Sequence, residues 1–174
     1  MIHKLAEGTL NTRFGEYREI LYYDGQKETI AMVYGKPEGQ KEVLCRIHSS
    51  CIYGHVFNSV ECDCRQQMEL AQHQIQQAGC GIIILMDQEG KGNGHLALMK
   101  SQAFKKAGIR QAEAYVAAGY AADARDFRAA AKILKDLDVQ SVSLITDNPL
   151  KAKTLEDLGI TLAPTLPQTP APHD

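Results

Sequence analysis

The feature that most constrains the fold is a change of hydrophobic periodicity near residue 64. Before it, four short runs of β-favouring residues are separated by Gly, Pro and Asp, which predicts a β-meander over residues 1–50. After it, apolar residues recur at helical spacing over residues 64–78, with Gln and Glu on the opposite side. Strands followed by alternating helices and strands predict a mixed α+β arrangement of the α/β class.

The second half of the chain alternates between apolar runs and amphipathic segments. Gly79 and Gly81 should end the first helix. Residues 81–88 form a continuous apolar run, which is typical of a strand buried on both faces. The segment 111–123 is ambiguous and fits a strand followed by a loop. The remaining expected elements are a Gly-rich loop at 89–94, helices at 95–106, 125–139 and 150–159, and strands at 141–149 and 160–167.

Composition bounds the size and the partners of the protein. A chain of 174 residues can bury one core, and we expect a single domain over residues 1–162 and a Pro-rich, disordered tail over residues 163–174. A net charge of −2 argues against binding nucleic acid or membranes through bulk charge, but it permits a local basic pocket for a phosphorylated small molecule. Neither a signal peptide nor a membrane-spanning apolar run is recognisable, so the expected location is cytoplasmic.

Three of the five cysteines lie within 14 residues, in the pattern C-x10-C-x-C formed by Cys51, Cys62 and Cys64. Crowded thiols in a chain without an export signal favour a metal site over a disulfide framework. Three thiolates without a fourth favour a catalytic zinc, because a structural zinc normally has four protein ligands. Two alternatives stay open: His48 or His55 completes the coordination, or the cysteines are reduced core residues.

Four segments in a fixed order carry a resemblance to a known family. They are CRIHSSC with CDCRQQ, then DQEGKGNG, then GYAADARDF, and then TDNPLK. Together they resemble GTP cyclohydrolase II, the first committed enzyme of riboflavin synthesis, over about residues 5–162. The resemblance implies a homodimer with one catalytic zinc per subunit that takes GTP with Mg²⁺. Such enzymes open the imidazole ring of the guanine and release formate and pyrophosphate to give a diaminopyrimidinone ribonucleotide.

The resemblance also implies roles for individual side chains. Cys51, Cys62 and Cys64 match the zinc ligands, whereas Asp123 matches the proton acceptor and Arg125 the proposed nucleophile. Further residues match positions that bind the substrate, including the guanine-site segment and the phosphate pocket: Arg46, His48, Ser49, Ser50, Gln67, Glu89, Gly90, Lys91, Gln111, Thr146 and Lys151.

Elementary chemistry supports these assignments and leaves some of them open. Hydrolysis of a guanine ring at neutral pH needs a strong nucleophile, and water on a catalytic zinc has a pKa near 7. The Glu89 carboxylate suits the guanine N1–H and amino group, the alternative being a solvated loop residue. Arg125 either attacks the α-phosphorus, stabilises phosphoryl charge, or belongs with Asp123 to a plain helix start, and deprotonating an arginine at pH 7 costs about 9 kcal/mol. The TDNP segment is an anion-binding helix start, a plain helix cap, or both.

Several positions around the expected pocket depart from the family pattern. The metal ligands match, whereas positions that contact the nucleotide have changed. Two alternatives therefore stay open: a divergent paralogue that acts on another guanine nucleotide or stops at the formamidopyrimidine product, and a zinc protein that binds nucleotides without turnover. The departures are Ser50 for Glu, Tyr53 for Thr, His55 for Asp, Lys91 for Arg, Gln102 for Tyr, Gln111 for Thr and Tyr115 for Asn.

Overall fold

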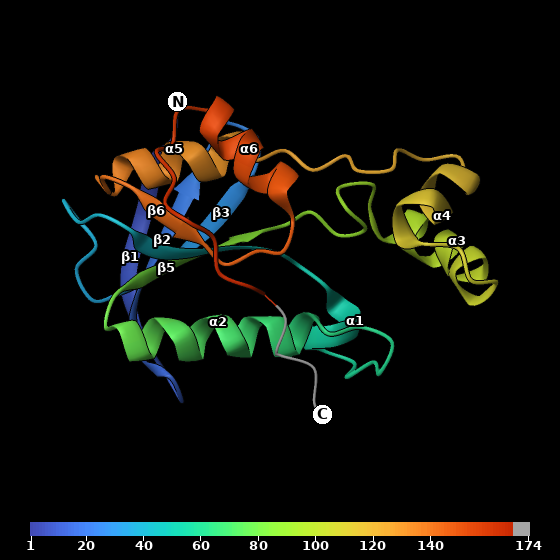
Figure 1. Cartoon of the computed structure of the whole chain (residues 1–174), viewed down its shortest axis with the longest axis horizontal. Coiled ribbons are helices and arrows are strands. Elements are labelled where there is room, and N and C mark those ends of the chain that lie inside the picture. Colours follow the sequence, from blue (N-terminus) through green and yellow to red (C-terminus); the bar gives the residue numbers. More distant parts are fainter. Residues whose placement is uncertain (169–174) are drawn as a thin grey trace.

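A computed structural model describes residues 1–168 and shows a mixed sheet with helices on both faces (Figure 1). This arrangement confirms the mixed α+β class. The strands are β1 (His3–Thr12), β2 (Gly15–Tyr23), β3 (Glu28–Tyr34), β4 (Val43–Ser49), β5 (Gly81–Met86) and β6 (Val142–Leu144). The helices are α1 (Ile52–His55), α2 (Cys64–Ala78), α3 (His95–Lys106), α4 (Gln111–Ala117), α5 (Arg128–Asp136) and α6 (Pro149–Asp157).

The strand order is β1-β2-β3-β5-β4-β6. The first three strands pair antiparallel and form the predicted meander. The fourth strand does not extend it, because β5 lies between β3 and β4, antiparallel to β3 and parallel to β4. β4 also pairs in parallel with β6, so the carboxyl ends of β4, β5 and β6 meet at one edge of the sheet.

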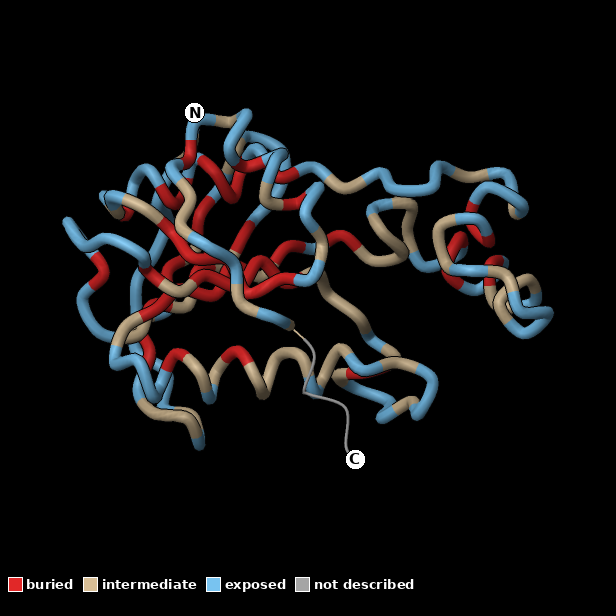
Figure 2. Tube along the Cα trace, in the orientation of Figure 1, coloured by how far each residue is buried: buried red, intermediate tan, exposed pale blue. Residues whose placement is uncertain are grey.

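Two apolar cores lie on opposite faces of the sheet, one under α2 and the other under α5 and α6 (Figure 1). Successive side chains of a strand point to opposite faces, and β5 follows this rule. Ile83 packs with Ile75 of α2, whereas Ile82 and Ile84 pack in the cluster that includes Ile133 of α5. Burial therefore concentrates along the central strands and the helix sides that face them (Figure 2). The prediction of a strand buried on both faces over residues 81–88 is confirmed for residues 81–86, whereas Asp87 lies beyond the strand and is exposed.

The junction between α2 and β5 explains why glycine stands at both of its positions. Gly79 has a left-handed backbone with φ of 80°, and its N–H donates to the carbonyls of Ile75 and Gln76, so it ends the helix as predicted. At Gly81, an added Cβ would lie 2.6 Å from the Ile75 side chain. The missing side chain lets α2 lie close against the sheet.

Residues 87–127 leave the sheet after β5 and return at α5, carrying α3 and α4 away from the main body (Figure 1). The reading of residues 111–123 as strand and loop is wrong for their first part, which is the helix α4. Ala114 and Tyr115 of this helix are buried, and Tyr115 joins Ala97 and Leu98 of α3 in a small separate cluster. Because the segment packs on a helix and reaches no free strand edge, it adopts helical structure.

The C-terminal segment is folded as far as the structure describes it. Leu162 and Leu166 form single bridges with Val142 and Ile145, so the expected last strand is reduced to two pairings. The Leu166 N–H and carbonyl both bond to the segment at β6. Residues 163–168 are thus part of the folded unit and not a disordered tail, because backbone pairing outweighs their Pro-rich composition. Residues 169–174 lie outside the described part. Within residues 1–168, none of the helices has the length and apolarity needed to cross a bilayer.

Candidate active site

A cavity of about 380 Å³ opens at the edge where β4 and β5 end. Parallel strands deliver the loops that follow them to a common edge, which is where open α/β sheets bind ligands. The loop after β4 leads into Cys51, and the loop after β5 leads into Glu89. Of the residues expected from the sequence, the cavity brings together Arg46, His48, Ser49, Ser50, Cys51, Cys62, Cys64, Gln67, Glu89, Gly90, Lys91, Gln111, Arg125 and Lys151.

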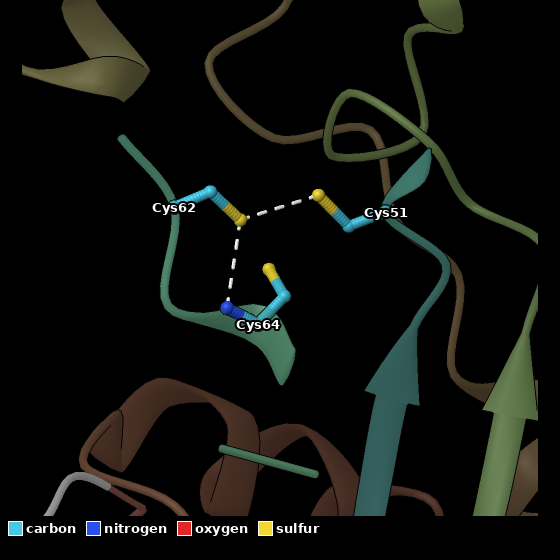
Figure 3. A group of neighbouring side chains, drawn as sticks. All are labelled: Cys51, Cys62 and Cys64. Carbon is cyan, nitrogen blue, oxygen red and sulfur yellow. Dashed lines mark hydrogen bonds between the residues drawn. The ribbon is translucent and has the colours of Figure 1, made fainter. Parts of the chain in front are cut away.

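The three cysteine thiols point toward one another (Figure 3), and all three cysteines line this cavity. Cys51 precedes α1, Cys62 lies in the loop before α2, and Cys64 begins α2. All three Sγ atoms lie within 4.8 Å of one another, and those of Cys51 and Cys62 are 3.4 Å apart. Burial, followed by the neighbouring thiols, raises the pKa of Cys64, and burial also raises the pKa of Cys51. A bound cation would relieve this crowding of potential thiolates, so the donor set fits a thiophilic metal such as zinc.

A buried polar network lies beside the thiols. Arg46, which is 4% exposed, donates from Nε to His48 Nδ1 at 3.2 Å and from Nη2 to Gln67 Oε1 at 2.9 Å. Because His48 Nδ1 accepts, its ring proton is on Nε2, which faces His55 Nε2 at 2.8 Å. Burial, with the charge of Arg46 next, lowers the pKa of His48 to about 3, so this ring is neutral at physiological pH.

The histidine pair does not complete the metal ligand set. Among residues 1–168, the group close enough to share one ion consists of the three cysteines. His48 and His55 instead satisfy each other, with their rings 4.9 Å apart between centroids. The alternative of a site closed by histidine therefore finds no support in the described residues, and a three-thiol site remains.

Cationic side chains gather in the same cavity. Lys151, 7% exposed, donates from Nζ to the Ile47 carbonyl at 2.6 Å. Burial, followed by the charges of Arg46 and Arg125, lowers the pKa of Lys151 to about 7. Arg46 and Arg125, joined by Lys151 when its amine is protonated, make this cavity favourable for an anionic ligand.

Asp123 holds Arg125 in a two-pronged ion pair. Arg125 donates from Nε to Asp123 Oδ1 at 3.0 Å and from Nη2 to Oδ2 at 2.6 Å. Burial acts to raise the pKa of Asp123, but the hydrogen bonds and charge of Arg125 outweigh it and lower that pKa. Arg125 lines the cavity, whereas Asp123 is not among its lining residues.

Thr146 is the other expected contact that the structure does not bring to the cavity. Its hydroxyl accepts from the Asn148 N–H at 3.1 Å, and Asn148 caps α6 by accepting from the Leu150 N–H. Thr146 lines a separate hollow together with Thr165. The TDNP segment therefore acts as a helix cap. Lys151, two residues after it, is the basic side chain of this region that lines the cavity.

The Gly-rich loop links the carboxylate of Glu89 to the Asp123–Arg125 segment. Glu89 Oε1 accepts from the Ile52 N–H at 3.1 Å, so this side chain is anchored and is not a solvated loop residue. At Gly92, with φ of 84°, an added Cβ would lie 2.5 Å from the Ala124 carbonyl oxygen. The Lys91 carbonyl accepts from the Ala124 N–H at 2.8 Å, which fixes the two segments together.

Sequence reasoning missed several residues of the cavity wall. Gln168 accepts from Arg46 Nη1 at 2.6 Å, but the Pro-rich composition around it gave no signal of order. Gln88, directly before Glu89, donates to the Asp126 carbonyl at 2.7 Å, and its place in the DQEGKGNG segment was an available signal. Tyr115 was noted only as a departure from the family, and recognising α4 would have placed it in the wall.

Comparisons with known proteins find related sequences over almost the whole chain. Residues 3–167 match the family model described as GTP cyclohydrolase II. The GTP cyclohydrolase-2 of Histophilus somni is 39% identical over 168 residues, covering 95% of this chain and 78% of that protein. The riboflavin biosynthesis protein RibBA of Bacillus cytotoxicus is 38% identical over 168 residues, covering 95% of this chain and 42% of that protein. A crystal structure of RibBX, a two-domain 3,4-dihydroxy-2-butanone 4-phosphate synthase from A. baumannii, aligns with a TM-score of 0.49 and 16% identity over 84% of this chain and 34% of that one.

Proposed function

The chain belongs to the GTP cyclohydrolase II family of hydrolases, and we propose that it is a zinc-dependent enzyme that opens the imidazole ring of GTP and releases formate and pyrophosphate. The observation that carries this proposal is the combination of thiols and basic side chains that line one cavity. The thiols of Cys51, Cys62 and Cys64 converge in it, and the basic side chains of Arg46, Arg125 and Lys151 line it as well. A guanine ring and its triphosphate need this combination of a metal and positive charge.

The thiols of Cys51, Cys62 and Cys64 would hold the zinc ion. When bound there, zinc would supply Lewis acidity and would lower the pKa of water in its open coordination position. Three converging protein donors, without a histidine to complete the set among the described residues, support a catalytic rather than a structural site.

Glu89 would orient the guanine. Its carboxylate lines the cavity and is held by the Ile52 N–H, which precedes α1 and follows Cys51. The base-reading carboxylate and the first thiol are therefore tied to the same short segment. Hydrogen bonds from the guanine N1–H and amino group to this carboxylate would place the ring at a fixed position relative to the thiols.

The cations would bind the Mg²⁺-bound triphosphate. Arg46 donates to four protein acceptors, namely His48, Ile145, Gln168 and Gln67, so most of its hydrogen-bonding capacity is already used. Lys151 and Arg125 keep donors for phosphate oxygens. Arg46 thus contributes mainly charge and rigidity, whereas the other two make the contacts.

The ion pair with Asp123 favours one of the two catalytic roles considered for Arg125. Forming a neutral, nucleophilic guanidine at pH 7 costs about 9 kcal/mol. A carboxylate whose pKa lies below its usual range is a poor base for that step, and its charge stabilises the guanidinium further. We therefore assign Arg125 the stabilisation of charge on the transferring phosphoryl group.

A second candidate is a related enzyme with altered substrate or product. It is favoured by the position of the departures from the family pattern, because Tyr53, Lys91, Gln102, Gln111 and Tyr115 all line the cavity. Such an enzyme would keep the metal chemistry but take another guanine nucleotide, or release the ring-opened formamide without completing deformylation.

One experiment separates these possibilities. Zinc-loaded protein is incubated with GTP, GDP or GMP and Mg²⁺, and formate, pyrophosphate and the nucleotide products are measured by enzymatic assay and mass spectrometry. The proposal expects formate and pyrophosphate from GTP, and loss of formate release after zinc is removed. Turnover restricted to another nucleotide, or a formylated end product, supports the second candidate. Binding of these nucleotides with no turnover contradicts both and leaves a non-catalytic zinc protein. The homodimer and the cytoplasmic location remain predictions.

A further inference from the structure

Arg65 joins the two segments that supply the three thiols. It follows Cys64 directly and lies in the first turn of α2. Its Nε donates to the Gly54 carbonyl at 3.1 Å, and its Nη2 donates to the His55 carbonyl at 2.6 Å. Both carbonyls belong to α1, whose preceding residue is Cys51. A single guanidinium thus connects α1, which follows Cys51, to the start of α2, which holds Cys64.

These two bonds give a partner to the last two carbonyls of α1. The end of a helix leaves carbonyls without intrahelical partners. The Ile52 carbonyl accepts from the N–H groups of the two residues after the helix, and the Tyr53 carbonyl accepts from the Ser59 N–H. The remaining two, on Gly54 and His55, accept from Arg65. A four-residue helix cannot hold itself together in water, so its geometry depends on such outside partners.

The position of Arg65 is otherwise unfavourable for a cation. The first turn of a helix carries partial positive charge, where acidic residues are preferred, and α2 has none there. The carbonyl end of α1 supplies the compensating negative partial charge. An arginine fork also matches two successive carbonyls, which the single ammonium of a lysine does not.

Packing alone does not fix the loop between the two segments. Its apolar side chains point to solvent, since Val56 is 60% exposed, Phe57 66% and Val60 99%. The direct contact between α1 and the thiols is made by Gly54, where an added Cβ would lie 3.0 Å from Cys62 Sγ and 3.2 Å from Cys64 Cβ. Arg65 holds Gly54 in that contact through the carbonyl of the same residue.

We infer that Arg65 is a positioning residue for the metal site, which holds Cys51 in place relative to Cys62 and Cys64 before the ion binds. This inference rests on the proposed zinc site. The arginine touches neither metal nor substrate. It lowers the cost of ordering the ligands, and its removal should weaken metal binding by loosening α1.

The test compares Arg65→Gln with a matched control, Arg13→Gln. Arg13 lines the same small surface hollow as Arg65, but its guanidinium pairs with the Glu69 carboxylate and not with the carbonyls of α1. Zinc affinity of the reduced proteins is measured by competition with a chromophoric chelator, and the Co²⁺-substituted proteins are compared by their charge-transfer and d–d absorption bands. Arg65→Gln should raise the Kd for zinc by about 10- to 100-fold, the usual effect of losing a residue that orients a metal ligand. It should also change the Co²⁺ spectrum, whereas Arg13→Gln should match the wild type in both.

Every outcome of this comparison is informative. Wild-type affinity and spectrum for Arg65→Gln, or equal weakening in both variants, would overturn the inference. If circular dichroism shows that Arg65→Gln is unfolded, Arg65→Lys replaces it, and a smaller rise of the Kd is expected because the charge stays while the fork is lost. No nucleotide is needed, so a wild-type protein that binds zinc without turning over GTP contradicts the proposed reaction and leaves this test intact. A wild type that binds no zinc overturns the inference together with the metal site.

Discussion

At the residue scale, the cavity concentrates groups that are costly to bury. Lys151 is nearly inaccessible to solvent and donates to one carbonyl. Two nearby arginines, Arg46 and Arg125, carry the same positive charge and repel it. Such a residue destabilises the free protein and is compensated when an anion binds. The energetic burden of the site is therefore measurable without any substrate.

Replacing Lys151 should reveal this burden as a dependence of stability on pH. The folded pKa of about 7 lies below the value near 10.4 of an unfolded lysine, so the unfolded chain binds more protons between these values. The penalty is fully present below pH 7 and is lost as pH rises toward 10.4. Lys151→Met should therefore raise the free energy of unfolding more at pH 6.5 than at pH 9.5, by more than about 1 kcal/mol.

Urea denaturation of both proteins at the two pH values measures this difference. Lys153→Met, which changes an exposed lysine of the same helix, is the control and should show no comparable difference. An equal effect of Lys151→Met at both pH values would contradict the assignment.

Asp123→Asn should slow release of pyrophosphate by about 100-fold, because the amide cannot hold the Arg125 guanidinium in the two-pronged pair. Asp126→Asn is a closely matched control. Asp126 makes the same kind of pair with Arg128, but neither residue lines the cavity that contains the three cysteines. Steady-state pyrophosphate assays should separate the two variants, and equal rates would show that the orientation of Arg125 is not required.

At the element scale, the Gly-rich loop positions Arg125 through backbone contact. Gly92→Ala would place a Cβ against the Ala124 carbonyl, whereas Gly94→Ala, with φ of 99°, meets no atom within 4 Å. Both variants carry the strain of a left-handed alanine, of order 1–3 kcal/mol. Only Gly92→Ala should also displace Arg125, so at equal loss of stability by urea denaturation it should lose more activity than Gly94→Ala. Equal activities would argue against the loop as a support for Arg125.

The elements that could be predicted from the sequence are those whose signal is local. Residues 64–78 form a helix with the expected bounds because the periodicity is clear and Gly79 ends it. The strand order could not be predicted, since the insertion of β5 between β3 and β4 is a long-range pairing that no local pattern encodes. Helix α4 was missed because its burial depends on α3.

The candidate site divides along the same line. The three thiols were recognised from their spacing, and the structure brings them together. Their supporting contacts, such as the bonds of Arg65 to α1 and of Gln168 to Arg46, depend on tertiary geometry and left no trace in the sequence pattern. Thr146 matched the expected motif, yet its hydroxyl is used to cap the segment before α6.

At the scale of the whole molecule, the C-terminal segment closes the sheet edge and reaches the cavity. A chain ending at residue 162 loses the bridge at Leu166, the bond from Ser143 to the Pro164 carbonyl, and the contact of Gln168 with Arg46. It should unfold at lower urea concentration and bind GTP more weakly. A chain ending at residue 168 keeps all these contacts and is the control. Denaturation and equilibrium binding measure both effects, and identical behaviour of the two chains would contradict a role for residues 163–168.

The arrangement of α3 and α4 separates part of the cavity lining from the three metal-binding thiols. These helices pack chiefly on each other and lie away from the main body (Figure 1), and Gln102 of α3 and Tyr115 of α4 line the cavity. The three thiols belong to a different part of the chain, residues 51–64. Substitutions within α3 and α4 can therefore reshape the cavity while the metal ligands, as well as Glu89 and Arg125, lie outside these helices and stay constant. Related proteins can therefore differ in the helices α3 and α4, and so in the substrate they accept, while they keep the same three-thiol site.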